Sequence, residues 1–173
     1  TKQSARSAKL YTQYMQQDFH FDWGVDYKYE SFSYRDKLQA ANSISGKFLE
    51  NYGVFGKTAL EKYDYPSRWK LRASARWDRS NRFRDFTSWQ IAPEYTYETL
   101  FDIILGGNVA NGFSYPSFLS LYWKGDTQVS GNPDLKPEES LSWLVFGKLD
   151  FDQHFLKVSY RQDKLKDMIV WFL

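Results

Sequence analysis

The stretch RWKLRASARWD, from Arg68 to Asp78, alternates strictly between two kinds of side chain. Its apolar members are Trp69, Leu71, Ala73, Ala75 and Trp77. The residues between them are polar and mostly basic. Successive side chains of a β-strand point to opposite faces, so this period of two predicts a strand with one apolar and one charged face. A half-buried strand of a soluble protein gives the same alternation, so the pattern alone leaves the environment of the apolar face open.

The same period recurs along the chain and predicts an all-β fold of about eight strands. The clearest repeats cover residues 21–30, 89–98, 101–109 and 141–151, and weaker ones cover 9–17, 52–62 and 155–161. Most exceed the about five or six residues of a typical globular strand, and they match the roughly 9–11 residues of a tilted membrane strand. An aromatic content of 20% also favours strands.

The predicted links alternate between short and long. Short turns are expected at Asp18–His20, Asp64–Ser67, Glu98–Leu100 and Asp152–His154, and longer loops at Arg35–Asn51, Arg79–Ser88 and Ala110–Ser140. Tight turns at one end of a sheet and long loops at the other are typical of an outer-membrane β-barrel. Trp69 and Trp77 fit this architecture, because eight residues span about 26 Å of strand. A tilt of about 40° reduces that to roughly 20 Å, close to the apolar band of about 25 Å between aromatic girdles.

Composition excludes several other classes. The 23 basic and 21 acidic residues nearly cancel, which gives no support for nucleic-acid binding. Without cysteine there are no disulfides and no thiolate metal sites. The longest wholly apolar run, Met168–Leu173, is far shorter than the roughly 20 residues of a spanning helix. The mean hydropathy of −0.63 still allows a membrane barrel, whose apolar face occupies only every second residue.

The segment SGNPDLKPEESLSW, Ser130 to Trp143, carries the most specific signal. It closely resembles the NPxLxPE segment that leads into a late barrel strand of TonB-dependent outer-membrane receptors. The matching residues are Asn132, Pro133, Leu135, Pro137 and Glu138. A proline disfavours the helical conformation of the residue before it, so the segment is predicted to run extended outside the sheet. Its predicted role is structural, to fasten a loop to the barrel rim.

The neighbouring sequence extends this resemblance. GNVANGFSYPSFLSLYW, upstream, is similar to the family's aromatic-rich approach to the segment, and Lys157–Trp171, with SYRQDKLKDMIVW, resembles the strand, short loop and strand that follow it. The resemblance implies a 22-stranded barrel in the Gram-negative outer membrane, plugged by an N-terminal domain. Residues 1–173 are then expected to be a partial barrel domain of about eight strands, without the plug or the remaining strands.

The family also implies a function and partners. The expected function is energised uptake of a scarce solute such as a siderophore, cobalamin, a glycan or a peptide. The expected partners are the TonB complex, reached through the plug, the solute, outer-membrane lipid and lipopolysaccharide, with a surface lipoprotein or a larger membrane complex left open. No enzymatic activity, cofactor or metal is expected. A small self-closed eight-stranded outer-membrane protein with a structural, adhesive or narrow-channel role, and a soluble carbohydrate-binding domain, remain alternatives.

Candidate site residues fall into three groups. Solute contacts are expected from loop aromatics and basic residues, namely Phe113, Tyr115, Phe118, Tyr122, Trp123, Arg79, Arg82 and Arg84. Packing of the loop is the alternative role for these aromatics, and lipopolysaccharide phosphates or Asp78 and Asp85 are alternative partners for these arginines. A membrane girdle is expected from Trp69, Trp77, Trp23, Trp89 and Trp143. The third group is the family motif described above.

Other motifs give weaker indications of chemistry. His20 and His154 are the only histidines, and exposed turn positions are favoured for them over a shared metal. The adjacent carboxylates Glu138 and Glu139 would point to opposite faces of a strand, which does not suit catalysis. Gly106-Gly107 lacks the spacing of a phosphate-binding loop and indicates a bend or bulge. No serine is marked as the partner of a histidine in a hydrolase.

Overall fold

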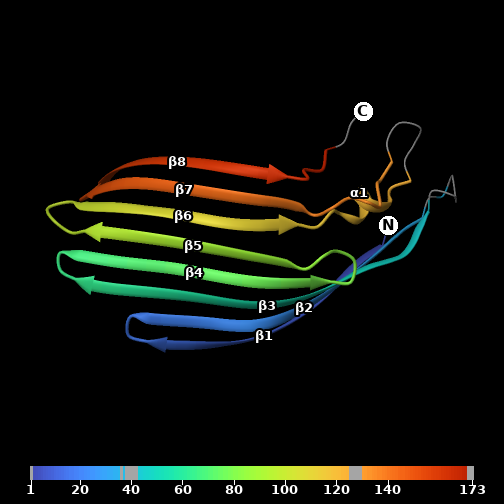
Figure 1. The fold of residues 1–173 in the computed structure, drawn as a ribbon, viewed down its shortest axis with the longest axis horizontal. Coiled ribbons are helices and arrows are strands. Elements are labelled where there is room, and N and C mark those ends of the chain that lie inside the picture. The colour runs from blue at the N-terminus through green and yellow to red at the C-terminus, as the bar shows by residue number, and fades with distance from the viewer. Residues whose placement is uncertain (1, 36, 38–42, 125–129, 171–173) are drawn as a thin grey trace.

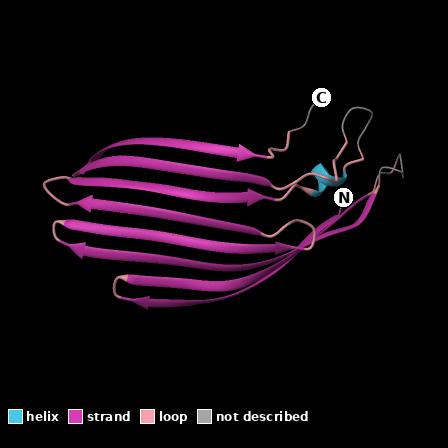
Figure 2. Ribbon diagram, viewed as in Figure 1, coloured by secondary structure: helices cyan, strands magenta, loops and turns pink. Residues whose placement is uncertain are grey.

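A computed structural model of the chain describes residues 2–35, 37, 43–124 and 130–170. They form one antiparallel sheet with a short helix at one end (Figures 1 and 2). In chain order the elements are β1 (Lys2–Gln16), β2 (Phe19–Tyr34), β3 (Ile44–Asp64), β4 (Ser67–Ser80), β5 (Phe86–Tyr97), β6 (Asp102–Ser114), α1 (Phe118–Tyr122), β7 (Glu138–Phe151) and β8 (His154–Lys166). The eight strands confirm the predicted all-β class and strand count.

Each strand pairs with its neighbour in sequence, so the sheet is a simple meander. The links at residues 17–18, 65–66, 98–101 and 152–153 lie at one end, which we call the turn end. The links that contain residues 35–43, 81–85 and 115–137 lie at the other, the loop end (Figure 1). The predicted placement of short turns at one end and longer links at the other is therefore confirmed, although the link predicted at Arg79–Ser88 spans only residues 81–85.

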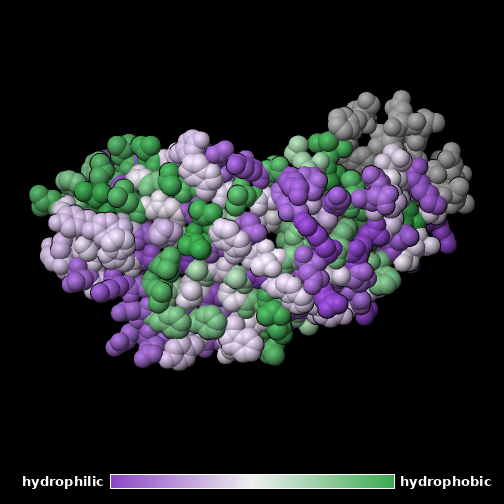
Figure 3. Space-filling model, viewed as in Figure 1, coloured by the Kyte–Doolittle hydropathy of each residue, from purple (hydrophilic) through white to green (hydrophobic). Residues whose placement is uncertain are grey.

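The pairing register divides the side chains between two faces, because residues paired across a ladder share a face. The apolar face carries Trp23, Val54, Trp77, Trp89, Trp143 and Tyr160. The polar face carries Asp26, Lys57, Arg76, Gln90 and Arg161. In Figure 3, hydrophobic side chains are numerous toward the turn end and hydrophilic ones gather near the loop end.

The predicted loop boundaries differ from the structure. β3 begins at Ile44 instead of after Asn51, and β6 continues to Ser114 instead of ending near Val109. α1 lies inside the long loop predicted for residues 110–140. These strand ends lack clear alternation, yet backbone pairing does not require an apolar face, so the ladder continues past the pattern. After Lys166 the described residues contain no second strand, contrary to the resemblance, and Trp171 lies outside the described residues.

Burial is concentrated near the loop end and not between layers. Phe32, Ile44 and Leu49 are nearly inaccessible, Phe32 stacks on Phe118 of α1, and Leu121 of α1 is only 2% exposed. By contrast, every residue of β1 and β8 is exposed. Within the described parts of the chain, β1 pairs only with β2, and β8 only with β7. These strands form an open sheet, which contradicts the self-closed eight-stranded alternative. No helix among the described residues is long and apolar enough to cross a membrane.

Candidate functional site

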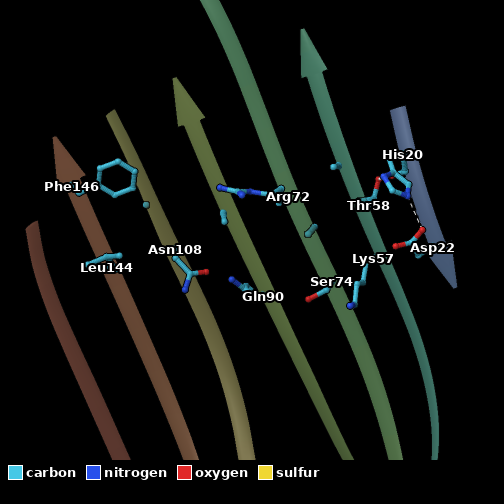
Figure 4. Close-up of a pocket in the computed structure, with 14 residues that line it drawn as sticks. His20, Asp22, Lys57, Thr58, Arg72, Ser74, Gln90, Asn108, Leu144 and Phe146 are labelled. Carbon is cyan, nitrogen blue, oxygen red and sulfur yellow. Dashed lines mark hydrogen bonds and ion pairs between the residues drawn. The ribbon is translucent and has the colours of Figure 1, made fainter. Parts of the chain in front are cut away.

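The polar face of the sheet lines a hollow. A hollow of about 570 Å³ extends over β2 to β7 and is lined by Lys57, Arg72, Gln90 and Asn108 among others (Figure 4). His20 and Asp22 lie at its β2 edge, with 2.7 Å between His20 Nε2 and Asp22 Oδ1. Of the basic residues in the opening stretch, Arg72 lines this hollow, and Arg76 lines a second hollow together with Lys57 and Gln90.

Arg76 is the centre of the best-connected group on this face. Its guanidinium donates to Asp26 Oδ1 at 2.9 Å and, from Nε, to both oxygens of Asp78 at 2.8 Å. Asp78 is only 4% exposed. Gly53 lies directly beneath, because a Cβ there would fall 2.1 Å from Arg76 Nη2. The glycine thus lets one arginine join β2, β3 and β4.

A second ionic group lies at the turn end. Arg68 donates to Glu98, which also accepts from the Tyr63 hydroxyl at 2.9 Å. These two hydrogen bonds, first that of Arg68 and then that of Tyr63, lower the pKa of Glu98 in its turn. Lys70 Nζ lies 3.2 Å from Glu61. Ion pairs therefore occur along the whole length of the polar face, from the turn end to the loop end.

The candidate groups for chemistry stay apart. His20 lies on β2 and His154 begins β8, at the two sides of the sheet. Glu138 Oε1 accepts from the Ile169 amide, whereas Glu139 pairs with Arg84 and Lys166. Gly106 is in the middle of β6, where the Phe146 ring occupies the place of a Cβ at 2.5 Å. Among the described residues, no group of three or more His, Cys, Asp or Glu side chains could hold a metal ion.

The five predicted girdle tryptophans all lie on the apolar face. Trp69 is 57% exposed and Trp77 38%, although both are large and apolar. Trp23 and Trp89 are also exposed, and Trp143 is half-buried against Tyr160 at a ring distance of 5.1 Å. None of them points into the polar hollow.

A regular spacing of aromatics emerges on this face once the strands are aligned. Pairs eight residues apart recur on four strands: Phe21 and Tyr29, Trp69 and Trp77, Trp89 and Tyr97, and Trp143 and Phe151. Trp23 lies two residues inside the first pair. The opening stretch shows only one of these pairs, and the others become visible through the register.

The aromatic positions also shift steadily from strand to strand. The aromatic residues nearer the loop end are Tyr52 on β3, Trp77 on β4, Trp89 on β5, Trp143 on β7 and Tyr160 on β8. In the ladder register, each of them lies two residues closer to the turn end than the one before it, which makes four steps of two residues. Those steps add up to about 26 Å along the strands over five gaps of about 4.8 Å. The resulting slope is close to the tilt of about 35–45° of strands in membrane barrels.

Most of the aromatic residues predicted to bind solute stack on neighbouring aromatic rings. Phe118 stacks on Phe32 with the rings 5.6 Å apart and 5° from parallel. Phe113 stacks on Phe86 at 4.6 Å, and Tyr115 on Phe83 at 5.0 Å. Burial, with a smaller effect of the nearby Asp78 carboxylate, raises the pKa of Tyr115 to about 12. These contacts hold the loops together at the loop end.

Tyr122 and Trp123 differ in their surroundings. Tyr122 has two cations over its ring, Lys47 Nζ at 4.6 Å and Arg82 at 5.0 Å. Trp123 contacts Tyr34 at 5.2 Å and lines a hollow of about 610 Å³ together with Lys47. Tyr122 lines the same hollow, so these two of the five aromatics are the ones that adjoin it.

The three predicted arginines have different partners. Arg82 donates to the Pro133 carbonyl at 2.6 Å. Arg84 pairs with Glu139 and lies 4.7 Å from the Phe86 ring centre. Arg79 is exposed at the end of β4, and no ion pair joins it to the described residues. Neither Asp78 nor Asp85 pairs with them in the described parts of the chain, since Asp78 is held by Arg76.

The NPxLxPE residues join three segments. Asn132 Oδ1 accepts from the Asp134 amide at 2.9 Å, and the Asn132 amide donates to Ser120 of α1 at 2.9 Å. The Pro133 carbonyl accepts a hydrogen bond from Arg82, and Pro137 is buried. Glu138 Oε1 accepts a hydrogen bond from the Ile169 amide, in the segment after β8. Leu135 is half-buried. Sequence reasoning missed Lys47, Lys136 and Lys166, which meet this rim only in the fold; no local pattern distinguishes them from other lysines.

Comparison with known proteins gives a consistent result. The family described as TonB dependent receptor-like, beta-barrel, matches residues 2–173. Vitamin B12 transporter BtuB of Photobacterium profundum is 30% identical over 107 residues, which cover 61% of this chain and 16% of that protein. The BtuB of Vibrio vulnificus is 23% identical over 142 residues, covering 82% and 20%. The chain thus spans about a fifth or less of these relatives.

A solved structure shows the same fold. Copper transporter OprC superposes with a TM-score of 0.63 at 16% identity, over 96% of this chain and 30% of that one. At this level of identity the likeness concerns the arrangement of strands.

Proposed function

The chain belongs to the TonB-dependent receptor-like β-barrel family of the outer membrane, and we propose that it forms part of the wall of a transporter that takes up a scarce solute with energy from the TonB complex. The observation that carries this proposal is the division of the open sheet into an apolar face and a concave, ion-paired face. A wall between lipid and a hydrated lumen requires such a division. A soluble carbohydrate-binding domain exposes a few aromatic rings for stacking, but not a whole apolar face such as this one, on which Trp69, Ile91, Leu105 and Val145 are all exposed.

The open edges support further strands on both sides. β1 and β8 would each leave a row of backbone groups unpaired in lipid, where an unpaired group is costly. We infer that other parts of the protein pair with both strands and that the sheet is about a third of a 22-stranded barrel. The Oδ1 atoms of Asn51 and Asn108 are buried and accept no hydrogen bond from the described residues. Water or a plug domain in the lumen would satisfy them.

The two aromatic bands define the proposed membrane boundaries. Indole and phenol rings favour the interface, where an apolar body meets lipid and a polar edge meets headgroups. Between the bands, Leu71, Ala73 and Ala75 of β4 would face hydrocarbon. The loop end would then lie outside the cell, where Trp123 and its hollow are available to an incoming solute. The NPxLxPE residues would brace this rim, and the wall would carry out no bond chemistry.

The substrate is tested in cells that lack the gene for the full-length protein. Labelled cyanocobalamin is the first probe, since two relatives are named for vitamin B12. A ferric siderophore, a copper complex, an oligosaccharide and a peptide follow. We expect one of these to accumulate only when the gene is restored, with uptake abolished by a protonophore. Uptake that persists without an energised inner membrane would instead indicate a diffusion channel.

A further inference from the structure

A second hollow, of about 440 Å³, lies at the loop end on the β7 and β8 side. Four cations line it, Arg82, Arg84, Lys136 and Lys166, against two carboxylates, Glu139 and Asp167. We call it the basic rim hollow. Arg82 is bonded to a carbonyl, and Lys136 makes no ion pair with the described residues. The hollow therefore carries an excess of positive charge, and Leu135 and Pro137 supply apolar walls.

The position of the hollow relative to the aromatic band is defined by the register. Glu139 and Lys166 are paired and lie on the apolar face, the same face as Trp143 and Tyr160. Glu139 lies four residues beyond Trp143 toward the loop end, about 13 Å along the strand. A tilt of about 45° makes this roughly 9 Å above the band, which is the height of the headgroup layer outside the hydrocarbon core.

We propose that the basic rim hollow binds a phosphate group of a lipid in the outer leaflet. Arginine and lysine provide charge-assisted hydrogen bonds to phosphate oxygens, and the excess cations would balance the phosphate charge. The apolar walls suit the part of a lipid that adjoins its phosphate. In the outer leaflet of this membrane the ligand would be a phosphorylated glycolipid, such as lipopolysaccharide. Of the three arginines considered from sequence, the site uses Arg82 and Arg84, joined by two lysines and not by Arg79.

This proposal rests on the membrane placement given above, and its test is independent of transport. The full-length protein is purified in detergent, and its binding of phosphorylated lipid A, dephosphorylated lipid A and inorganic phosphate is measured by native mass spectrometry. The Lys136→Gln/Lys166→Gln variant removes two exposed charges from the hollow. Lys57→Gln/Lys62→Gln is the matched control, with one cation on the polar face and one near the turn end.

We expect phosphorylated lipid A to bind the Lys136→Gln/Lys166→Gln variant about tenfold more weakly than the wild type, and the control to bind it normally. Dephosphorylated lipid A should bind the wild type as weakly as the phosphorylated lipid binds the variant. Equal binding of both lipids to the wild type would overturn the proposal even if the variant failed to fold. Unchanged binding by a folded variant, or full displacement of the lipid by millimolar inorganic phosphate, would also overturn it. Absence of solute uptake alongside normal lipid binding would count against the transport function alone.

Discussion

At the scale of single residues, the polar face depends on charges that satisfy one another. Arg76 bridges Asp26 and Asp78, and the absence of a side chain at Gly53 leaves room for its guanidinium. Arg72, four residues earlier on the same face, is 65% exposed and reaches Glu94 only at 3.9 Å. The two arginines look equivalent in the sequence, but their environments differ sharply.

This difference predicts unequal effects of the same substitution. Arg76→Leu removes the cation that holds the buried Asp78 and the hydrogen-bond donor to Asp26, so we expect the free energy of unfolding to fall by about 2–3 kcal/mol. Arg72→Leu should lower it by less than about 1 kcal/mol. Urea-induced unfolding of the full-length protein in lipid vesicles measures both. Equal losses would show that the Arg76 group is no more than a surface ion pair.

At the scale of elements, the loop end is a packed cluster. Arg82 contacts Pro133 and Tyr122 and so links the β4–β5 loop to α1 and the NPxLxPE segment. Arg79 carries the same charge three residues earlier without such contacts. The described parts of the β4–β5 loop and of the NPxLxPE segment are thus predicted to be ordered before any solute arrives.

Replacing the linking arginine should loosen this cluster. We expect Arg82→Ala to increase the rate of proteolytic cleavage within residues 115–137 at least about fivefold, because contacts to two segments are lost. Arg79→Ala serves as the control and should leave the rate unchanged. Cleavage kinetics of intact cells, followed by mass spectrometry, provide the measurement. Equal rates in both variants would mean that Arg82 does not anchor the loops.

The two faces of β4 should respond oppositely to a new charge. Ala73→Arg places a cation midway between Trp69 and Trp77 on the apolar face, and we expect it to cost about 2–4 kcal/mol, as near a bilayer midplane. Ser74→Arg adds the same side chain on the polar face and should cost under about 1 kcal/mol. Folding titrations in lipid vesicles compare the two. A smaller cost for Ala73→Arg than for Ser74→Arg would reverse the assignment of faces.

The diagonal aromatic band leads to a prediction about depth. Spin labels attached at cysteines replacing Tyr52, Trp89 and Tyr160 should lie at one depth in the bilayer, although these residues occupy different rows of the ladder. A label at Thr87 provides the contrast. Thr87 lies two residues nearer the loop end than Trp89, so its label should lie at a shallower depth than the labels at Tyr52 and Trp89. Collision with oxygen and with a nickel chelate reports depth. Depths that followed the ladder rows would contradict the inferred tilt.

At the scale of the whole molecule, the described strands form a curved wall and not a closed body. A sheet of this kind buries little of its own apolar surface, and its few buried residues, such as Phe32 and Leu121, gather at the rim. In the proposed barrel we expect stability to come from lipid on one face and from further strands at both edges.

Amide hydrogen exchange tests this view of the edges. In the full-length protein we expect the outward-pointing amides of β1 and β8 to exchange as slowly as those of β4, because neighbouring strands would hold them. Exchange resolved by fragmentation mass spectrometry gives the comparison. Rapid exchange at alternate residues of both edge strands would mean that the sheet is open in the membrane.

The sequence by itself determined the strands, their order and the contrast between their faces. A period of two in Arg68–Asp78 and its repeats is a local property, and so is the spacing of Trp69 and Trp77. The extended conformation of the NPxLxPE residues could also be predicted, because proline restricts the backbone of its immediate neighbours. The start of β3 and the end of β6 could not be predicted, since the strand pairing continues there without apolar alternation.

Only the tertiary structure decided which residues meet at the rim and on the polar face. Arg82 with Tyr122, Arg76 with Asp26, and Lys136 with Lys166 are brought together by strand register and by the path of long loops. The diagonal aromatic band has the same origin, because it exists only across strands. Contacts of this kind depend on the relative placement of distant segments, which a local pattern does not contain.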